Sequence, residues 1–272
     1  MRTGLDLEAQ YRKRTSRRWR DRLVQLILPP APFVMNPAEP KDFPLGRWNL
    51  YIGGAGQMPH GYINIDLVLV PGVDVVADAE HLPFPPDTFR RVECDAVLEH
   101  VHNPEQVMRE IQRVLAPRGF VHLVTPFCHP RHEYPGDFRR FTIDGLKELA
   151  GPLDVVAEGL RTGPTATLLI IWIVNVKLLL PFRTWRLLTH LVWGWLLFPL
   201  RYLDLLLFRS PAAPRIGNHC YLWLQKPSPM SVAMRGRRAG QANPSLRTQS
   251  TTPRPSTTSA PIWLQTSKIF ER

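Results

Sequence analysis

Between residues 48 and 160, short apolar runs alternate with helical patterns, and this alternation most constrains the fold. The apolar runs predict strands at about 48–53, 62–66, 73–77, 91–97, 119–125 and 154–160. Asn103 begins a helix with Pro and Gln in its first turn, which the sequence APRG ends, and Thr142 begins a second that runs to Ala150. Strands separated by helices are typical of an α/β fold with a mainly parallel sheet.

The first predicted strand runs directly into a glycine turn, in the sequence LYIGGAG at residues 50–56. Such a turn alone is equally compatible with a plain bend. Acidic residues, however, stand near the ends of later strands, at Asp66, Asp78 and Glu99. Ligands bind at this edge of open α/β sheets, where glycine N–H groups can approach an anionic group. A nicotinamide fingerprint fits poorly, because the interval from Gly56 to Asp66 is too short for its helix.

Longer stretches of the same region resemble the class I S-adenosylmethionine-dependent methyltransferases, in particular the type 11 methyltransferase domain family. The resemblance is carried by GYINIDL, by DVVADAEHLPFPPDTF and by VLEHVHNPEQVMREIQRVLAPRGF, and it covers residues 48–160 with a strand at 218–227. It implies a Rossmann-like sheet whose last strand is antiparallel, and an enzyme that uses S-adenosyl-L-methionine. The following HPRHEYPGDFRRFT resembles a branch whose members often lie among genes for surface polysaccharides.

The resemblance also implies which residues bind the cofactor. They lie at the ends of the first four strands and are Gly53, Gly54, Gly56, Asp66, Asp78, Ala79, Leu98 and Glu99. In the family, the glycines hold the methionine part and the first acid holds the ribose hydroxyls. The second acid and the residue after it face the adenine amino group, and the fourth strand ends beside the sulfonium.

Three departures from the family pattern concern the glycine turn. Tyr51 replaces the usual acid, Ala55 and Gln57 replace two glycines, and QMPHG is very short for a parallel crossover. Tyr51, Ala55 and Gln57 motivate an alternative from another class, a non-catalytic membrane-associated interaction protein on a methyltransferase scaffold.

Methyl transfer itself requires mainly that donor and acceptor be held close together, and this proximity can supply roughly 7–11 kcal/mol. A hydroxyl acceptor also needs a base to remove its proton, and histidine suits that task. The predicted catalytic residues are His100, His129 and His132, with His102 a further candidate. Each could instead be a surface or hydrogen-bonded histidine. HPRHE could also bind a metal, but no third ligand stands at a recognisable spacing, so no metal is predicted.

A charged loop follows the fifth predicted strand and contains Asp137, Arg139 and Arg140. These residues either shape the loop or contact an anionic acceptor such as a phosphate or a uronic acid. A solvated charged loop is the plainer alternative.

Residues 162–215 are the most apolar part of the chain, with tryptophans spread along them and polar residues interrupting each run. This pattern suits a helical hairpin at a membrane interface. A buried helical pair or a dimer face is the alternative. Because a strand follows at 218–227, both ends of the hairpin must lie on one side of any bilayer, which favours a monotopic arrangement.

The chain is predicted to divide into five segments. Residues 1–46 form a basic helix (5–28) and a Pro-rich linker, 47–161 the methyltransferase core, 162–215 the hairpin, 216–227 the last strand and 228–272 a disordered tail.

The net charge of +11 is concentrated partly in RKRTSRRWRDR at residues 12–22. Anionic lipid is its simpler partner, since no RNA-binding fold accompanies it. Three isolated cysteines indicate a reducing compartment.

The sequence therefore predicts a cytoplasmic S-adenosylmethionine-dependent methyltransferase, peripheral or monotopic at the inner face of the cell membrane. We expect it to O-methylate a glycan or a lipid-linked small acceptor. A nucleic-acid methyltransferase ranks lower, because LEHV stands where a base-flipping motif would follow the fourth strand. The oligomeric state stays open.

Overall fold

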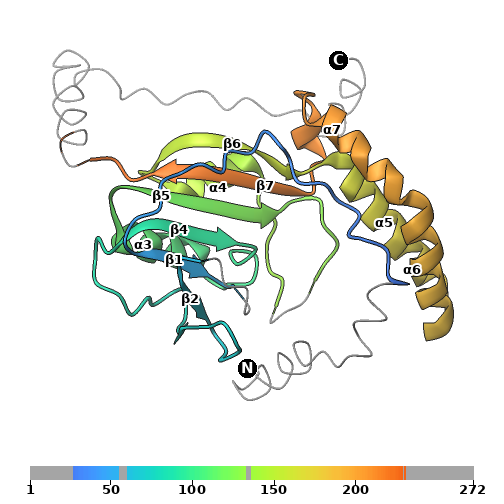
Figure 1. The fold of residues 1–272 in the computed structure, drawn as a ribbon, viewed down its shortest axis with the longest axis horizontal. Coiled ribbons are helices and arrows are strands. Elements are labelled where there is room, and N and C mark those ends of the chain that lie inside the picture. Colours follow the sequence, from blue (N-terminus) through green and yellow to red (C-terminus); the bar gives the residue numbers. More distant parts are fainter. Residues whose placement is uncertain (1–26, 55–59, 133–135, 229, 231–272) are drawn as a thin grey trace, which may run out of the picture. The chain divides into compact units, whose positions relative to one another are not determined.

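The computed structural model describes residues 27–54, 60–132, 136–228 and 230, and the element labels follow Figure 1. The described strands form one seven-stranded sheet in the order β3-β2-β1-β4-β5-β7-β6. They are β1 (Asn49–Ile52), β2 (Ile63–Asp66), β3 (Val75–Val76), β4 (Phe89–Asp95), β5 (Leu115–Pro126), β6 (Asp154–Thr162) and β7 (His219–Gln225). The first five are parallel, and β7 lies antiparallel between β5 and β6. The predicted Rossmann-like sheet with an antiparallel last strand is therefore confirmed.

Helices α3 (Pro104–Val114) and α4 (Ile143–Ala150) both begin at the predicted caps. The Asn103 side chain accepts a hydrogen bond from the Gln106 N–H, and the Thr142 hydroxyl accepts one from the Gly145 N–H. The end of α3 differs from the prediction. β5 begins at Leu115, directly after the helix, so APRG lies within the strand, with Arg118 at a φ of 60°.

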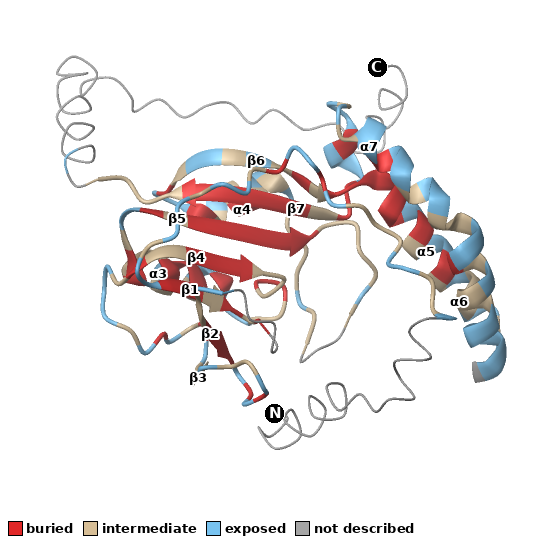
Figure 2. Cartoon of the chain, in the orientation of Figure 1, coloured by how far each residue is buried: buried red, intermediate tan, exposed pale blue. Residues whose placement is uncertain are grey.

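The face of the sheet that α3 and α4 cover is apolar (Figure 1). Alternate residues of the central strands point to this face and are almost fully buried (Figure 2), among them Leu50, Val92, Leu123 and Leu222. They pack with the apolar side of α3 in one hydrophobic core. The period of two along each strand therefore fixes which face the helices cover.

The opposite face is crossed by the Pro-rich linker, drawn in blue in Figure 1. The Asn36 side chain donates a hydrogen bond to the Leu160 carbonyl at 2.8 Å, which fastens the linker to β6. Further along, the Phe43 ring stacks on Trp223 of β7 with centroids 4.1 Å apart. The described part of the linker thus covers this face as extended chain.

A buried charged cluster lies under the linker. The His122 ring contacts Glu93 at 2.6 Å through Nδ1 and Glu39 of the linker at 2.9 Å through Nε2. Arg91 donates to Glu93 at 2.6 Å, and the His122 ring stacks on Trp223. A cavity of about 260 Å³ adjoins the cluster, and its lining includes Glu39, Glu93 and His122. We call His122, Glu39, Glu93 and Arg91 the buried charged cluster.

Two connections near the glycine turn are short. β1 and β2 are parallel neighbours, yet only residues 53–62 join them, and the described part of that connection contains no helix. β2 and β3 are likewise joined by residues 67–74 without a helix. Within the described residues, these two connections therefore supply no helix to cover the sheet, and the linker covers the face opposite α3 and α4 over β4 to β7.

Two helices occupy the apolar stretch between β6 and β7: α5 (Pro164–Leu178) and α6 (Arg183–Leu197). The 3₁₀ helix η1 (Phe198–Leu203), the short α7 (Asp204–Leu207) and the 3₁₀ helix η2 (Ala213–Arg215) follow. Among the described residues, none of the helices combines the length and apolarity needed to cross a membrane.

Asp204 joins α7 to the start of α5. This fully buried carboxylate accepts hydrogen bonds from the Thr165 and Ala166 N–H groups, at 2.7 and 3.1 Å. Free N–H groups at a helix start favour a negative charge, so Asp204 stabilises the turn where the inserted helices leave the sheet. The predicted helix at 5–28 lies almost wholly outside the described residues, as does nearly all of the predicted tail.

Candidate functional site

The glycine turn after β1 has a geometry that only glycine allows. Gly53 has a φ of 75°, and a Cβ at this position would run into the Val97 side chain. A Cβ on Gly54 would run into Asn64 of β2. The Gly53 N–H donates to the Ile65 carbonyl at 2.9 Å, which ties the turn to the neighbouring strand. The predicted third glycine, Gly56, lies outside the described residues.

The two acids predicted to hold the nucleoside lie in different surroundings. Asp66 is the last residue of β2 and is 8% exposed, at the edge where the glycine turn leaves β1. Asp78 lies two residues beyond β3 and is exposed, and its Oδ1 accepts from the Glu80 N–H at 2.9 Å. The adjacent Ala79 is buried. Asp66 is therefore held as a site residue would be, whereas the Asp78 carboxylate also shapes a turn.

The chain leaving β4 buries Leu98 and Glu99 completely. Neither oxygen of the Glu99 carboxylate has a hydrogen-bond partner among the described residues. The next residue, His100, is bonded through Nδ1 to the Gly136 carbonyl in the loop after β5. The Nδ1 atom therefore carries a proton, and Nε2 is the ring nitrogen that faces Glu99.

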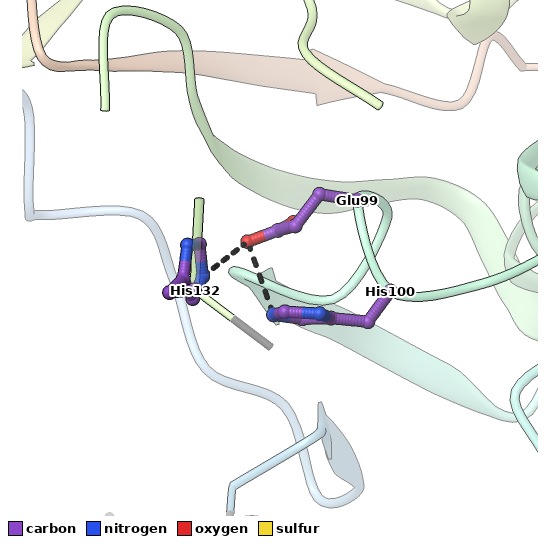
Figure 3. Close-up of side chains that lie close together, drawn as sticks. All are labelled: Glu99, His100 and His132. Carbon is purple, nitrogen blue, oxygen red and sulfur yellow. Dashed lines mark ion pairs between the residues drawn. The ribbon is translucent and has the colours of Figure 1, made fainter. Parts of the chain in front are cut away.

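The loop after β5 brings His132 to the same carboxylate, so Glu99 lies between two imidazoles (Figure 3). The Glu99 Oε1 atom lies 3.6 Å from His100 Nε2 and 3.7 Å from His132 Nε2. The interaction with Glu99 raises the pKa of His132, although burial opposes it. The structure thus unites three residues that the sequence predicted separately, two as bases and one as a cofactor ligand.

His129 lies beside this group, with its ring centroid 5.0 Å from that of His132. Its Nδ1 atom donates to the Pro130 carbonyl at 2.8 Å, and burial lowers the pKa of the imidazole. His102, by contrast, is exposed and packs on Phe138 at 4.2 Å. The structure therefore separates His102 from the other three histidines.

A fourth histidine of the group, His219, was not predicted from the sequence. It begins β7, its ring lies 5.3 Å from that of His129, and the backbone N–H of His219 donates to the Thr162 hydroxyl at 3.1 Å. Burial and neighbouring positive charges lower the pKa of His219 to about 3. The sequence did contain a signal for this residue, since His219 lies at the start of a predicted strand. Because β7 is antiparallel to β5, the start of β7 lies at the edge of the sheet where β5 ends.

A hollow of about 280 Å³ lies in the same loop region and is lined by Arg131, Asp137, Phe138, Arg139 and Arg140. Arg140 pairs with Asp137 through both guanidinium nitrogens, and this contact holds the pKa of Asp137 well below its usual range, against a smaller effect of burial. Arg139 donates to the Val101 carbonyl at 3.0 Å. The loop is therefore organised, and its lining carries a net positive charge.

Comparison with known proteins gives a family match over part of this region. The methyltransferase domain family matches residues 64–123. Over 82 residues the chain is 39% identical to the ubiquinone/menaquinone biosynthesis C-methyltransferase UbiE of Hahella chejuensis, which covers 30% of this chain and 30% of that protein. The chain thus matches less than a third of this relative's length.

Solved structures similar to this chain include the [4+2]-cyclase SpnF, with 16% identity, a TM-score of 0.45 and coverage of 76% of this chain and 81% of that one. Another is the 1,6-didemethyltoxoflavin-N1-methyltransferase of Burkholderia thailandensis, solved with S-adenosylhomocysteine, with 14% identity, a TM-score of 0.41 and coverage of 66% and 71%. Similarity at this level carries no argument about chemistry.

The family match covers β2 to β5, the part of the sheet that also holds Asp66 and Glu99. Outside it, the strand order and the antiparallel β7 are those expected from the resemblance. The methyltransferase domain match over residues 64–123 therefore lies within a sheet that has the strand order expected from the resemblance.

Proposed function

We propose that the protein is an S-adenosylmethionine-dependent methyltransferase whose cofactor binds at the carboxyl edge of β1, β2 and β4. The observation that carries the proposal is the glycine-only turn at Gly53 and Gly54 beside the buried Asp66. Asp66 lies within the region that matches the family, and the turn precedes that region. Open α/β sheets bind nucleotide-like ligands at this edge.

The residues present fit such a cofactor. Gly53 and Gly54 carry no side chains that would shield the backbone of the turn from a ligand. Asp66 would hold the ribose hydroxyls, and the buried Ala79 with Asp78 would lie toward the adenine. Leu98 and Glu99 would border the reacting end. When bound, the cofactor supplies an activated methyl group for an in-line displacement.

We assign the general base to His129. Its Nδ1 proton is held by the Pro130 carbonyl, so Nε2 presents a lone pair. Because burial lowers its pKa, the ring is neutral at pH 7 and can accept the proton of an acceptor hydroxyl. The rings of His100 and His132 lie beside it.

The acceptor that fits the neighbouring loop is anionic. Three arginines and one aspartate line the 280 Å³ hollow, and Asp137 is already paired with Arg140. Guanidinium groups bind phosphate and carboxylate groups in two-point contacts. A small glycan or lipid-linked acceptor that carries a phosphate or a uronic acid has this chemistry.

Membrane association is supported by the surface of the inserted helices. Large apolar side chains there are strongly exposed, including Leu178 at 75%, Leu179 at 81%, Phe182 at 65% and Leu196 at 63%. Helices α5 and α6 have 15 residues each, about 22 Å at 1.5 Å per residue, against a hydrocarbon core of about 30 Å. We therefore place them in the interface of an anionic membrane.

Methyl transfer is tested with S-adenosylmethionine carrying a tritiated methyl group and a bacterial lipid extract that contains lipid-linked saccharides. We expect label in the lipid phase, and at least 100-fold less with Asp66→Ala. Asp144→Ala is the matched control, because the Asp144 side chain is 95% exposed on α4. Equal labelling by wild type and Asp66→Ala would contradict the proposed site.

Membrane association is tested separately by flotation with vesicles of phosphatidylglycerol and phosphatidylethanolamine. We expect the wild type to float and the double variant Leu178→Gln, Leu179→Gln to float several-fold less. Leu69→Gln is the control, since Leu69 is 62% exposed on the loop after β2. Equal flotation of all three proteins, or none by the wild type, would contradict the membrane assignment.

A further inference from the structure

We propose that Glu99, His100 and His132 form a binding site for a divalent transition-metal ion, with Zn²⁺ as the first probe. One ligand atom from each residue lies within 4.8 Å of the other two. Two imidazole nitrogens and one carboxylate oxygen form a donor set known from zinc sites with an open fourth position. The three side chains converge in Figure 3.

The buried carboxylate is the strongest observation. Glu99 is completely buried, yet neither of its oxygens has a hydrogen bond among the described residues. A buried charge without a partner is costly, so such a group usually pairs with another charge or coordinates a metal. The two imidazoles do not satisfy it directly, because 3.6 and 3.7 Å exceed hydrogen-bond distances.

These same separations suit ligands of one ion. Zinc binds nitrogen and oxygen at about 2.0–2.2 Å, so tetrahedral ligands lie roughly 3.3–3.6 Å apart. Both Glu99–His distances are within a few tenths of an ångström of this range. The two imidazole nitrogens lie within 4.8 Å of each other, and closing them on one ion would complete the three-ligand arrangement.

The surrounding contacts orient both rings as ligands. His100 donates from Nδ1 to the Gly136 carbonyl, which leaves Nε2 toward Glu99. His132 faces the Asp137 carboxylate with Nδ1 at 3.6 Å, and Asp137 also accepts from the His132 backbone N–H at 2.8 Å. The Gly136 carbonyl fixes the tautomer of His100, as second partners of metal-binding histidines do. The Nδ1 atom of His132 faces Asp137 without a hydrogen bond.

The role of the ion follows from its open position and rests on the proposed function. A hydroxyl oxygen of the acceptor that bound there would lose its proton more readily. His129, beside His132, would take that proton while the oxygen attacks the methyl carbon and the carbon–sulfur bond breaks. The metal would therefore position and acidify the acceptor.

The test uses the full chain, stripped with a chelator and then titrated with Zn²⁺ by calorimetry and with Co²⁺ by visible absorption. We expect one ion per chain, and at least a 100-fold loss of affinity in His132→Ala and in Glu99→Gln. Glu99→Gln keeps the side-chain shape if His132→Ala folds poorly. His102→Ala is the matched control, because His102 is exposed and outside the cluster.

Titration with S-adenosylhomocysteine in the same samples separates this inference from the proposed function. Cofactor binding without metal binding by folded wild-type protein would overturn the metal site alone. Metal binding without cofactor binding would leave the site standing and contradict the methyltransferase assignment. Unchanged metal affinity in both His132→Ala and Glu99→Gln would also overturn the site.

Discussion

The two faces of the sheet are buried by different means. One face carries a large cluster of buried, mostly aliphatic side chains under α3 and α4. The other face carries Glu93, His122 and Trp223 under extended chain from the linker. Adjacent residues of β5 show the contrast, because Leu123 is fully buried on the first face and His122 is 6% exposed on the second.

The comparison shows how a sheet face covered by a linker differs from one covered by helices. A helix satisfies its own backbone and offers a continuous apolar stripe, so the strand residues beneath it can be aliphatic. A Pro-rich linker offers only scattered contacts such as Phe43 and Glu39, and the strands below it provide aromatic and charged partners. We therefore expect the contribution of the first face to the free energy of unfolding to depend on packing, and that of the second face to depend on charge.

The largest expected effect is on the helix-covered face. Leu123→Ala should lower the free energy of unfolding by about 3–5 kcal/mol, because it leaves a cavity in a fully buried core. The loss should be the same at pH 6 and pH 8.5. Urea denaturation at both pH values measures it, and a strong pH dependence would contradict a purely apolar face.

The neighbouring substitution His122→Ala should cost less, about 2–3 kcal/mol. Removing one partner of a buried ion pair commonly costs about 3–5 kcal/mol, but the adjoining cavity of about 260 Å³ lets water reach the two carboxylates. The same urea experiment measures this value. A loss larger than that of Leu123→Ala would reverse the comparison.

The free energy of unfolding of the wild type should depend on pH through the ionisable groups of the charged face, and this effect should be smaller than the loss caused by His122→Ala. Burial disfavours charged His122, but Glu39 and Glu93 outweigh it and raise its pKa above 6.5. Burial also disfavours charged Glu93, but His122 and Arg91 lower its pKa below 4.5. The first contribution is complete below pH 6.5 and is lost as pH rises through the raised pKa. The second is complete above pH 4.5 and is lost as pH falls through the lowered pKa.

The cluster should therefore stabilise the fold most between about pH 4.5 and 6.5. Unfolding free energies of the wild type and His122→Ala, compared across this range and above it, isolate the contribution. The difference between the two proteins should shrink as the pH rises above 6.5. A difference that stays constant up to pH 9 would show that His122 is not held as a cation.

The smallest expected effect is at the linker itself. Phe43→Ala should cost about 1 kcal/mol, since it removes a stacked aromatic pair with Trp223 from a half-buried position. It should also speed proteolysis within residues 35–46, which limited digestion and mass spectrometry would detect. Lys41→Ala, at an exposed linker position, is the control and should leave the digestion rate unchanged.

Local signals allowed most of the fold to be predicted. The caps Asn103 and Thr142 act within one helical turn, so their effect is visible in the sequence. The start of β5 was wrong by four residues, because APRG resembles a helix stop while Arg118 takes a left-handed φ within the strand. Strand register decides that position, and register depends on the neighbouring β4 and β7.

The site was predicted less completely because its parts come from distant segments. The glycine turn and Asp66 are close in sequence, and the resemblance predicts both as cofactor residues. The cluster of Glu99, His100 and His132 needs the β5 loop to fold back on the end of β4. The buried charged cluster needs Glu93 and His122 to be register partners, with Glu39 placed by the linker. No spacing in the chain encodes these distances.

The most direct test of the central claim is calorimetric titration of the detergent-purified protein with S-adenosylhomocysteine, beside Asp66→Ala and the control Asp144→Ala. We expect micromolar binding by the wild type and by Asp144→Ala, and no measurable binding by Asp66→Ala. Absence of binding by folded wild-type protein, or equal binding by Asp66→Ala, would contradict the assignment of the β1–β2 edge as the cofactor site.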